Sequence, residues 1–523
     1  MADESEILEV EWQFDAPDLE RVIAWLKAAN VPGYTVREGP VKRPSDTYYD
    51  TADWRIARGK FTCRVRQKGA DAELTLKGLA TMEEGRRSRR EMNERVSDAS
   101  PGGLVAAPGM CGNVLRLVAG RRHLAALFTL DQERATFILA DDTGDLGEIT
   151  VDDTRVRDSD ARVKRVEVEV DAAAVDRSRR FVDVLIAAGG LLPGTLSKYQ
   201  AGLAAVGLHA APTETTLGST AVAASMTAGE VGYAVLRRHF AVFLANEGGT
   251  RLGEDIEGLH DMRVAARRLR AAMQAFRPWA PVRMERFRLE LGWVAAALGV
   301  VRDLDVQLER LAEWQAEDPA RALALEAIAT ILNARRDYAR KRMLLALDAR
   351  RYDVFVERFA AVLRAGPPRS LLAAKEPILA VGPGMIDKRY RRLRRLGDAI
   401  KKDSPAADYH ALRIDGKKLR YALEFLGPVY GAPATSFATR LTALQDVLGL
   451  HQDAEIASDL LGEIAATAGR RLTPETVLAM GAIQERYRLH GMELRASFTG
   501  VYKPLRGKEW STLQKTMRKS ARG

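Results

Sequence analysis

The stretches "LHDMRVAARRLR" (259–270) and "YHALRIDGKKLR" (409–420) repeat one pattern of a histidine followed by cations. On a helical wheel, the cations three, seven and ten residues after each histidine fall on one narrow stripe. The stripes are His260, Arg263, Arg267 and Arg270 in the first copy, and His410, Arg413, Lys417 and Arg420 in the second. A second shared pattern, "LGVVRDLDV" and "LGLHQDAEI", places Asp303 and Asp453 each 43 residues after the histidine. Equal spacing predicts a duplicated helical unit.

A single charged helix face is usually a solvated face. Like charges stacked three, four and seven residues apart destabilise an isolated helix, however, so two such stripes suggest that an anion offsets the repulsion. For the histidines two interpretations stay open: contact with that ligand, or burial with a hydrogen bond to a nearby acid such as Asp303 or Asp453. No close pair of histidines indicates a metal site.

Positive charge is concentrated in the second half of the chain. From Ala228 onward there are 50 Lys and Arg against 35 Asp and Glu, whereas the preceding residues carry a net negative charge. A basic domain of this kind favours polyanions such as nucleic acid, membrane headgroups or polyphosphate. In "KRYRRLRRLGDAIKK" (388–402), Arg391 and Arg395 belong to a further cationic face, for which a solvated surface is an equal alternative.

Several classes of protein are excluded by composition. No apolar run approaches the roughly 18 residues of a membrane span, and the acidic start of the chain lacks the apolar core of a signal peptide. Cys63 and Cys111 are too few for a disulfide framework. We therefore expect a cytoplasmic protein that does not enter a membrane. The absence of a GxxxxGK[ST] motif argues against a P-loop ATPase.

Two domains are predicted from periodicity. Segments such as "FTCRVRQKG" (61–69) and "KRVEVEVD" (164–171) alternate with a period of two, whereas Ala/Leu/Arg-rich segments after residue 228 have a period of 3.6. The nearly uncharged stretch between them is typical of a linker. We expect an α+β domain at 1–205, a linker at 206–229 and an all-α domain at 230–515, with repeat halves near 230–365 and 385–515.

The duplicated motifs resemble the CHAD family, the conserved-histidine α-helical domain, across roughly residues 228–515. The resemblance implies two similar helical bundles that form one basic domain. It further implies binding of inorganic polyphosphate and association with polyphosphate granules. We expect the two stripes, together with Arg391 and Arg395, to make the phosphate contacts. Guanidinium groups suit such multidentate phosphate contacts. Lys417 in the second copy has the same charge as Arg267 but lacks the planar guanidinium group that binds phosphate through two hydrogen bonds.

In the first domain, charges of opposite sign are segregated onto different strands. Glu9 and Glu11 share one strand face, and so do Glu167 and Glu169, whereas Arg64 and Arg66 share a face of another strand. The ordinary interpretation is a solvated polar face on each strand. If these faces converge inside a closed barrel, they form a tunnel that binds phosphates through cations and Mg²⁺ or Mn²⁺ through carboxylates.

This layout resembles the CYTH family, the triphosphate tunnel metalloenzymes, across roughly residues 5–205. The stretches that carry the resemblance include "EVEWQ" (9–13), "TYYDT" (47–51), "LTLKG" (74–78) and "LSKYQAGL" (196–203). It implies an antiparallel tunnel barrel and metal-dependent hydrolysis of inorganic triphosphate. It implies metal ligands at Glu9, Glu11, Asp152, Glu167 and Glu169, and phosphate contacts at Arg64, Arg66, Lys77, Arg134 and Lys198. Glu9, Glu11 and Lys77 would take part in catalysis.

One residue departs from the family pattern. The opening family motif is Glu-x-Glu-x-Lys, and this chain has Gln13 at the lysine position. Two functions therefore stay open: a working triphosphatase joined to a polyphosphate-binding domain, or a granule-associated binding protein with a degenerate tunnel. Nucleotide triphosphates and thiamine triphosphate remain alternative substrates. Nucleic-acid binding is disfavoured because no aromatic platform interleaves the basic stripes.

Overall fold

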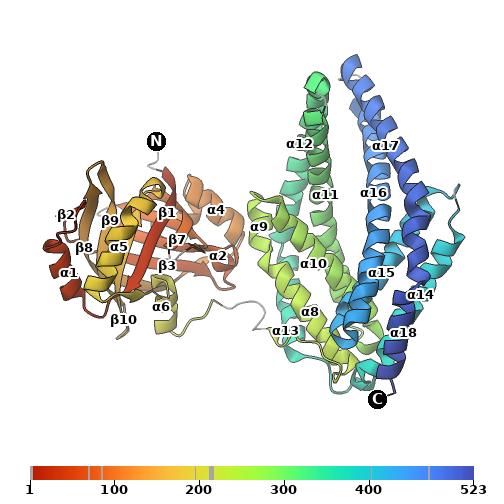
Figure 1. Ribbon diagram of the computed structural model, residues 1–523, viewed down its shortest axis with the longest axis horizontal. Coiled ribbons are helices and arrows are strands. Elements are labelled where there is room, and N and C mark those ends of the chain that lie inside the picture. Colours follow the sequence, from red (N-terminus) through yellow and green to blue (C-terminus); the bar gives the residue numbers. More distant parts are fainter. Residues whose placement is uncertain are drawn as a thin grey trace. The chain divides into compact units, whose positions relative to one another are not determined.

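The computed structural model describes residues 4–68, 71–83, 86–194, 196–210, 217–317, 319–401, 403–468 and 472–522. The chain forms two compact units (Figure 1). The first comprises Met1–Ala211 together with the short segment Glu247–Glu254, and the second comprises Pro212–Asn246 and Asp255–Gly523.

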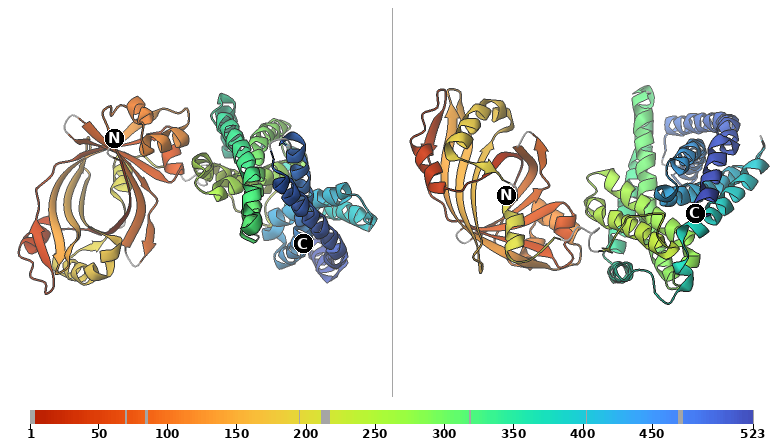
Figure 2. Two further views of the ribbon diagram at one scale, coloured as in Figure 1. Left: turned by 90° about the horizontal axis from the view of Figure 1, so that it is seen from above. Right: turned by 60° about the horizontal axis from the view of Figure 1, so that its bottom comes forward.

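The first unit is built on one antiparallel sheet. Its strands are β1 (Glu4–Asp15), β2 (Thr35–Glu38), β3 (Ser45–Thr51), β4 (Phe61–Lys68), β5 (Asp71–Gly78), β6 (Thr81–Glu83), β7 (Arg86–Val96), β8 (Leu124–Asp141), β9 (Gly144–Val156), β10 (Arg162–Val170) and β11 (Leu192–Pro193). Eight of them close into a barrel in the order β1-β10-β9-β8-β3-β4-β5-β7, because β7 pairs with β1 again. The strands curve around a common axis in Figure 2. The predicted antiparallel barrel is confirmed.

The barrel strands turn their apolar residues outward, where helices cover them. The helices of this unit are α1 (Leu19–Lys27), α2 (Arg55–Arg58), α3 (Pro101–Ala106), α4 (Met110–Ala119), α5 (Val175–Gly189) and α6 (Lys198–Ala205). Trp12 of β1 is buried in a core with Phe181 of α5, and Cys63 of β4 is buried in another core with Leu115 of α4. Because side chains alternate along a strand, the polar residues face the barrel interior. The alternation predicted from sequence is present, but its polar side is enclosed.

The second unit is helical throughout its described residues apart from loops and turns, which confirms the predicted all-α domain. Its helices are α8 (Ala228–Ala245), α10 (Ile256–Ala275), α11 (Met284–Glu317), α12 (Pro319–Leu347), α13 (Arg350–Ala365), α14 (Ile378–Ala399), α15 (Ala406–Tyr430), α16 (Ala432–Ala468), α17 (Pro474–Tyr502) and α18 (Lys508–Ser520). None of the described helices is long and apolar enough to span a bilayer.

The two halves of the helical unit begin side by side. α8 and α14 start at Ala228 and Ile378, which are separated by the same interval as His260 and His410. The residues just before them, Thr227 and Pro377, form an isolated antiparallel bridge. The amide of Ala228 donates to the carbonyl of Glu376 at 2.8 Å, and that of Ile378 donates to Met226 at 3.0 Å. This reciprocal pairing is what a duplicated unit with an approximate two-fold axis would make.

Helix α9 (Glu247–Leu252) follows α8 in sequence but belongs to the first unit. Glu247 is 3% exposed, and it accepts hydrogen bonds from Arg251 at 2.8 Å and from Arg58 of α2 at 2.7 Å. A Cβ atom on Gly248 would lie only 2.4 Å from the Cα of Gly59, so the two backbones are in direct contact. The polypeptide therefore passes from one unit to the other three times.

Candidate functional site

The barrel interior holds a polar cavity of about 210 Å³. Its lining combines residues that lie far apart in the sequence, because each barrel strand contributes the inward half of its side chains. The sequence-predicted residues in this lining are Glu9, Glu11, Arg64, Arg66, Lys77, Arg134, Glu167, Glu169 and Lys198. The structure thus brings together all of the predicted tunnel residues except Asp152.

Glu9 is held by two cations. The Lys77 ammonium lies 2.6 Å from Glu9 Oε1, and the Arg89 guanidinium donates to Glu9 Oε2 at 2.5 Å. Burial by itself would raise the pKa of Glu9, but the charges of Lys77 and Arg89 outweigh it and hold the pKa at about 2. Lys77 also lies 2.6 Å from Glu91 of β7. Glu9 is therefore ionised, and its charge is compensated from neighbouring strands.

Glu11 has much less compensation. Arg89 donates to it at 3.0 Å, yet burial, followed by repulsion from Glu167, raises the pKa of Glu11 to about 7. Glu167 lies on the neighbouring strand β10, where its Oε1 accepts a hydrogen bond from Gln13 of β1 at 3.0 Å and its Oε2 accepts one from Lys198 at 2.8 Å. The amide at position 13 thus makes a hydrogen bond where the family motif has a cation, and it adds no charge.

Asp152 lies behind the cavity lining and is fully buried. It accepts two hydrogen bonds from Arg134, at 2.7 and 2.8 Å, and one from Lys198 at 2.5 Å. Its oxygens are therefore engaged in orienting two of the predicted phosphate-binding cations. The resemblance had assigned Asp152 to metal binding, and the geometry favours the role of a counter-ion.

Four charged residues of the cavity lining were missed by sequence reasoning: Asp46, Glu73, Arg89 and Glu91. Asp46 of β3 is 2% exposed, and it accepts hydrogen bonds from Arg66 at 2.7 and 2.8 Å and from Gln132 at 2.7 Å. The charges of Arg64 and Arg66 hold the pKa of Asp46 well below its usual range despite its burial. Arg89 and Glu91 could have been found from the period-two spacing within "RRSRREMNERV" (86–96).

The tunnel carboxylates suit a divalent cation by their chemistry. Glu9, Glu11, Glu167 and Glu169 present hard oxygen ligands to one cavity, and repulsion from Glu167 and Glu9 contributes to the raised pKa of Glu11. As the side chains stand, no three or more His, Cys, Asp or Glu residues in the described part of the chain gather into a metal site. Both oxygens of Glu9 are bonded to cations, one to Lys77 and the other to Arg89.

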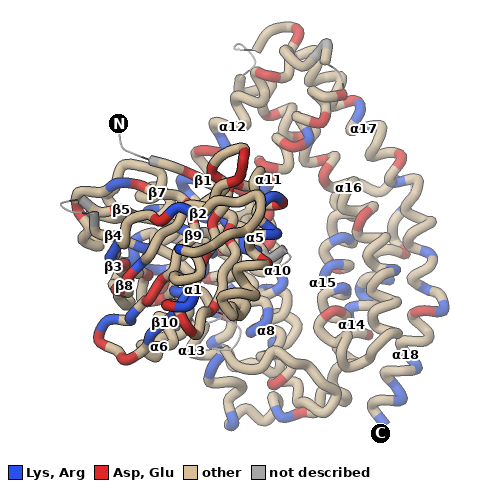
Figure 3. Tube along the Cα trace, turned by 60° about the vertical axis from the view of Figure 1, so that its left-hand side comes forward, with Lys and Arg blue, Asp and Glu red and all other residues tan. Residues whose placement is uncertain are grey.

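In the helical unit, the two predicted stripes lie next to each other on α10 and α15, whose cations are coloured in Figure 3. Arg267 of α10 donates to the hydroxyl of Tyr421 on α15 at 2.8 Å. Burial lowers the pKa of Lys417 to about 7, and the nearby charges of Arg413, Arg267, Arg420 and Arg263 contribute to the shift. Cations from both copies of the motif therefore act on one another directly.

The acids and histidines of the motif have partners that differ from those expected. Asp303 accepts a hydrogen bond from Arg263 at 2.8 Å, and Asp453 pairs with Arg310 at 3.3 Å. His410 is exposed and bonds through Nδ1 to the side chain of Gln452 at 2.5 Å, so the interpretation as a buried histidine bonded to Asp453 is wrong. His260 is half-buried on α10.

Of the remaining predicted cations, Arg270, Arg391 and Arg395 are exposed and Arg420 is half-buried. Arg270 is exposed near Gly292 of α11, and Arg420 pairs with Glu424 on its own helix at 3.5 Å. Arg391 and Arg395 lie on an exposed face of α14, where Arg391 pairs with Asp387 at 3.6 Å. No hydrogen bond or ion pair among the described residues links Arg391 or Arg395 to the two stripes.

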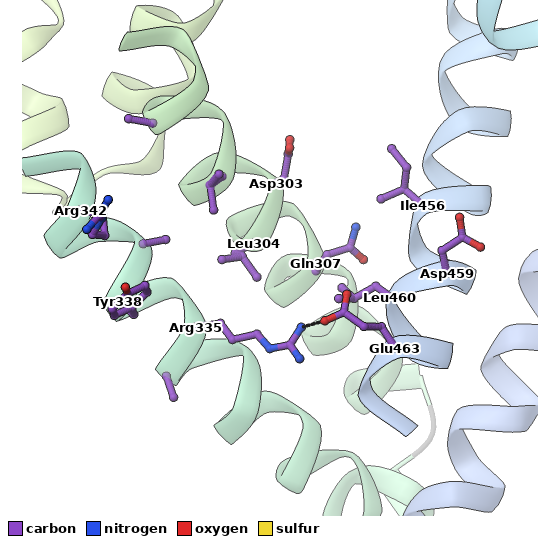
Figure 4. A pocket seen from close by; sticks show the side chains of 14 residues that line it. Asp303, Leu304, Gln307, Arg335, Tyr338, Arg342, Ile456, Asp459, Leu460 and Glu463 are labelled. Carbon is purple, nitrogen blue, oxygen red and sulfur yellow. Dashed lines mark ion pairs between the residues drawn. The ribbon is translucent and has the colours of Figure 1, made fainter. Parts of the chain in front are cut away.

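A larger cavity of about 950 Å³ lies between α11, α12 and α16 (Figure 4). Apolar side chains such as Leu304, Ile456 and Leu460 form much of its wall. Arg335 is paired with Glu463 at 3.1 Å across it. Apolar walls and internally paired charges suit a polyanion poorly, so the cationic stripes are the better candidate for anion binding.

Comparison with known protein families divides the chain into the same two parts, the barrel domain and the helical domain. The family model for the CYTH domain matches residues 27–198, and the model for the CHAD domain matches residues 234–462. No curated protein matches the chain. CYTH proteins are generally metal-dependent.

Three solved structures illustrate the similarity. The CHAD domain from the plant Ricinus communis is 25% identical, with a TM-score of 0.47, over 55% of this chain and 95% of that chain. PptA from Streptomyces chartreusis is 23% identical, with a TM-score of 0.43, over 56% of this chain and 100% of that chain. HpAC1 from Hippeastrum is described as a candidate adenylyl cyclase with a dominant triphosphatase activity. It is 15% identical, with a TM-score of 0.31, over 38% of this chain and 97% of that chain. From the two family matches, the chain consists of an N-terminal CYTH domain followed by a CHAD domain.

Proposed function

We propose that this chain binds inorganic polyphosphate through its CHAD domain and hydrolyses inorganic tripolyphosphate in its CYTH tunnel with the help of Mg²⁺ or Mn²⁺. The observation that carries the proposal is the convergence of cations from β4, β5, β7, β8 and α6 on one enclosed polar cavity. A cytoplasmic location at polyphosphate granules follows from the same proposal.

The tunnel cations are arranged to hold a short chain of phosphates. Arg64, Arg66, Lys77, Arg134 and Lys198 would donate hydrogen bonds to its oxygens, and charge-assisted bonds of this kind are stronger than neutral ones. Asp46, within the lining, holds Arg66 in place, and Asp152, behind the lining, holds Arg134 and Lys198. The cations are thus oriented before the substrate arrives, which lowers the reorganisation needed during the reaction.

Hydrolysis would proceed by attack of water on a terminal phosphorus, with cleavage of the adjoining phosphoanhydride bond. The chain's part is to fix the phosphates and to stabilise the charge that develops on the leaving oxygen, which suits Lys77 and the arginines. A divalent cation held by Glu9 and Glu11, with Glu167 and Glu169 close by, would supply further charge neutralisation.

The stripes of α10 and α15 support the polyphosphate-binding part. Arg263, Arg267, Arg413 and Arg420 all contribute to lowering the pKa of Lys417, so the positive charge of this patch exceeds what its own acids compensate. A flexible chain with about one negative charge per phosphate would relieve that repulsion. Nucleic acid would supply the same charge, but the patch offers no aromatic platform for stacking bases.

The alternative of a binding protein with a weak tunnel has one observation in its favour, the neutral amide of Gln13. Phosphate release from tripolyphosphate by the purified chain, with Mg²⁺ or Mn²⁺, separates the two functions. Release that depends on metal and disappears in a Glu9→Gln/Glu11→Gln variant supports hydrolysis. Equal release by the variant, or none by either protein, leaves the binding function alone. ATP and thiamine triphosphate as comparison substrates test the preference for inorganic phosphate.

A further inference from the structure

Two tunnel cations occupy the carboxylates that are proposed to bind metal. Lys77 lies 2.6 Å from one oxygen of Glu9, and Arg89 lies 2.5 Å from the other. Arg89 also reaches Glu11 at 3.0 Å. Glu9 is 4% exposed and Glu11 is 2% exposed, so solvent does little to weaken these ion pairs. Both oxygens of Glu9 are therefore already in use.

A divalent cation cannot join this arrangement unchanged. Mg²⁺ binds carboxylate oxygens at about 2.1 Å, which places its charge close to any ammonium or guanidinium on the same carboxylate. Such a contact is strongly repulsive in a buried site. Metal binding at Glu9 therefore requires Lys77 and Arg89 to move away from it.

The other tunnel cations are held differently. Arg66 makes two hydrogen bonds to Asp46, and Arg134 makes two to Asp152. Asp152 lies behind the cavity lining, and Asp46 already takes up hydrogen bonds from Arg66 and Gln132. A metal at Glu9 and Glu11 would leave both of these pairs intact. At Glu9 and Glu11, exchange of partners therefore concerns Lys77 and Arg89, whereas Lys198 is bonded to Glu167.

We propose that Lys77 and Arg89 are internal counter-ions that compete with the divalent cation for Glu9 and Glu11. Metal binding releases them, and the released cations then bind the phosphate oxygens of the substrate. Before the metal arrives, the tunnel is neutralised internally and holds triphosphate weakly. This inference rests on the proposed function of the tunnel and adds an order to its binding events.

The test is equilibrium binding of Mn²⁺ alone to the intact chain, measured by calorimetry or by electron paramagnetic resonance. Lys77→Met removes a competitor, so we expect Mn²⁺ to bind about 5-fold to 100-fold more tightly than to the wild type. Arg66→Met is the matched control, because it removes one tunnel cation that does not touch Glu9 or Glu11; we expect it to change Mn²⁺ affinity by less than about 3-fold. Lys77→Gln serves the same purpose if Lys77→Met does not fold.

The tighter Mn²⁺ binding of Lys77→Met must disappear when Glu9→Gln and Glu11→Gln are added. That result would place the metal at Glu9 and Glu11. Unchanged or weaker Mn²⁺ binding by Lys77→Met, with binding still dependent on Glu9 and Glu11, overturns the competition and leaves the metal site standing. If Mn²⁺ binding is insensitive to Glu9 and Glu11 in every protein, the proposed metal site fails and the competition fails with it.

Discussion

Gln13 of β1 donates a hydrogen bond from its side-chain amide to Glu167 of β10, at 3.0 Å. The two residues are direct partners in the β1–β10 register, and Glu11 is the partner of Glu169 two residues away. A hydrogen bond at this position keeps Glu167 oriented, but it leaves the negative charge of Glu167 free to act on Glu11. The main effect of Gln13 on the tunnel is therefore that it adds no positive charge to offset Glu167.

Gln13→Lys would restore that charge. We expect tripolyphosphate to bind more tightly and kcat/KM to rise about 5-fold to 30-fold, because a buried cation beside Glu167 attracts phosphate and offsets the carboxylates. Steady-state kinetics against Gln13→Met, which removes the hydrogen bond without adding charge, provides the comparison. A rise in both variants would show that the hydrogen bond, and not the charge, limits the wild type.

Glu11 gives the first domain a defined pH dependence of stability. Its folded pKa is about 7, above the ordinary value of 4.5, so the folded state holds a proton that the unfolded state releases. The contribution of Glu11 to stability is thus present below about pH 4.5 and is lost as the pH rises through 7. In the wild type, this effect lowers the free energy of unfolding between pH 5 and pH 8. We expect Glu11→Gln to remove about 1–3 kcal/mol of that decrease. Urea titrations at the two pH values measure this, and parallel changes in both proteins would contradict it.

Glu247 is expected to be important for stability and not for phosphate binding. Glu247→Gln removes the negative charge that Arg251 and Arg58 share in a buried site, where loss of one partner typically costs about 3–5 kcal/mol. Urea unfolding should show this loss for the first unit. Tripolyphosphate binding at low denaturant should stay within about 2-fold of the wild type. A stability change below about 1 kcal/mol would show that the pair is not needed to hold α9.

Polyphosphate binding should be accompanied by proton uptake at Lys417. Its pKa is about 7, so at pH 8 the side chain is mostly neutral, and a bound polyanion would favour the charged form. Calorimetry in two buffers of different ionisation enthalpy should report an uptake of up to about one proton per chain at pH 8. Lys417→Arg should abolish the uptake, because arginine is charged throughout this range. Undiminished uptake by that variant would assign the proton to another group.

Much of the tunnel could be predicted because the alternation of side chains between the two faces of a strand can be recognised in the sequence. Glu9 and Glu11, or Arg64 and Arg66, are two residues apart and must share a face once the strand forms. Arg89 and Glu91 have the same spacing, but β7 also carries charge on its other face, as at Arg90, which makes the alternation harder to recognise. Their partners lie on β1 and β5, and no local pattern indicates which strand closes the barrel.

The helical unit shows the same division between local and long-range information. The stripe on each motif helix follows from the helical period, and the equal spacing of the two copies indicated duplication. The partners of Asp303 and Asp453 depend on how neighbouring helices pack, so they could not be read from spacing. Helix α9 belongs to the first unit through contacts between segments far apart in the chain, such as Gly248 with Gly59 and Glu247 with Arg58, and these leave no local signal.

If the paired stripes of α10 and α15 form one polyphosphate site, removal of their cations must weaken binding more than removal of equal charge elsewhere. The most direct measurement compares the affinity of long-chain polyphosphate, at fixed ionic strength, for wild type and for Arg263→Ala/Arg267→Ala/Lys417→Ala. The control is Arg350→Ala/Arg358→Ala/Arg364→Ala, which removes the same formal charge from exposed positions on α13. We expect affinity to fall about 30-fold or more for the stripe variant and less than about 3-fold for the control. Equal losses in the two variants would contradict it, because binding would then follow net charge and not the stripes.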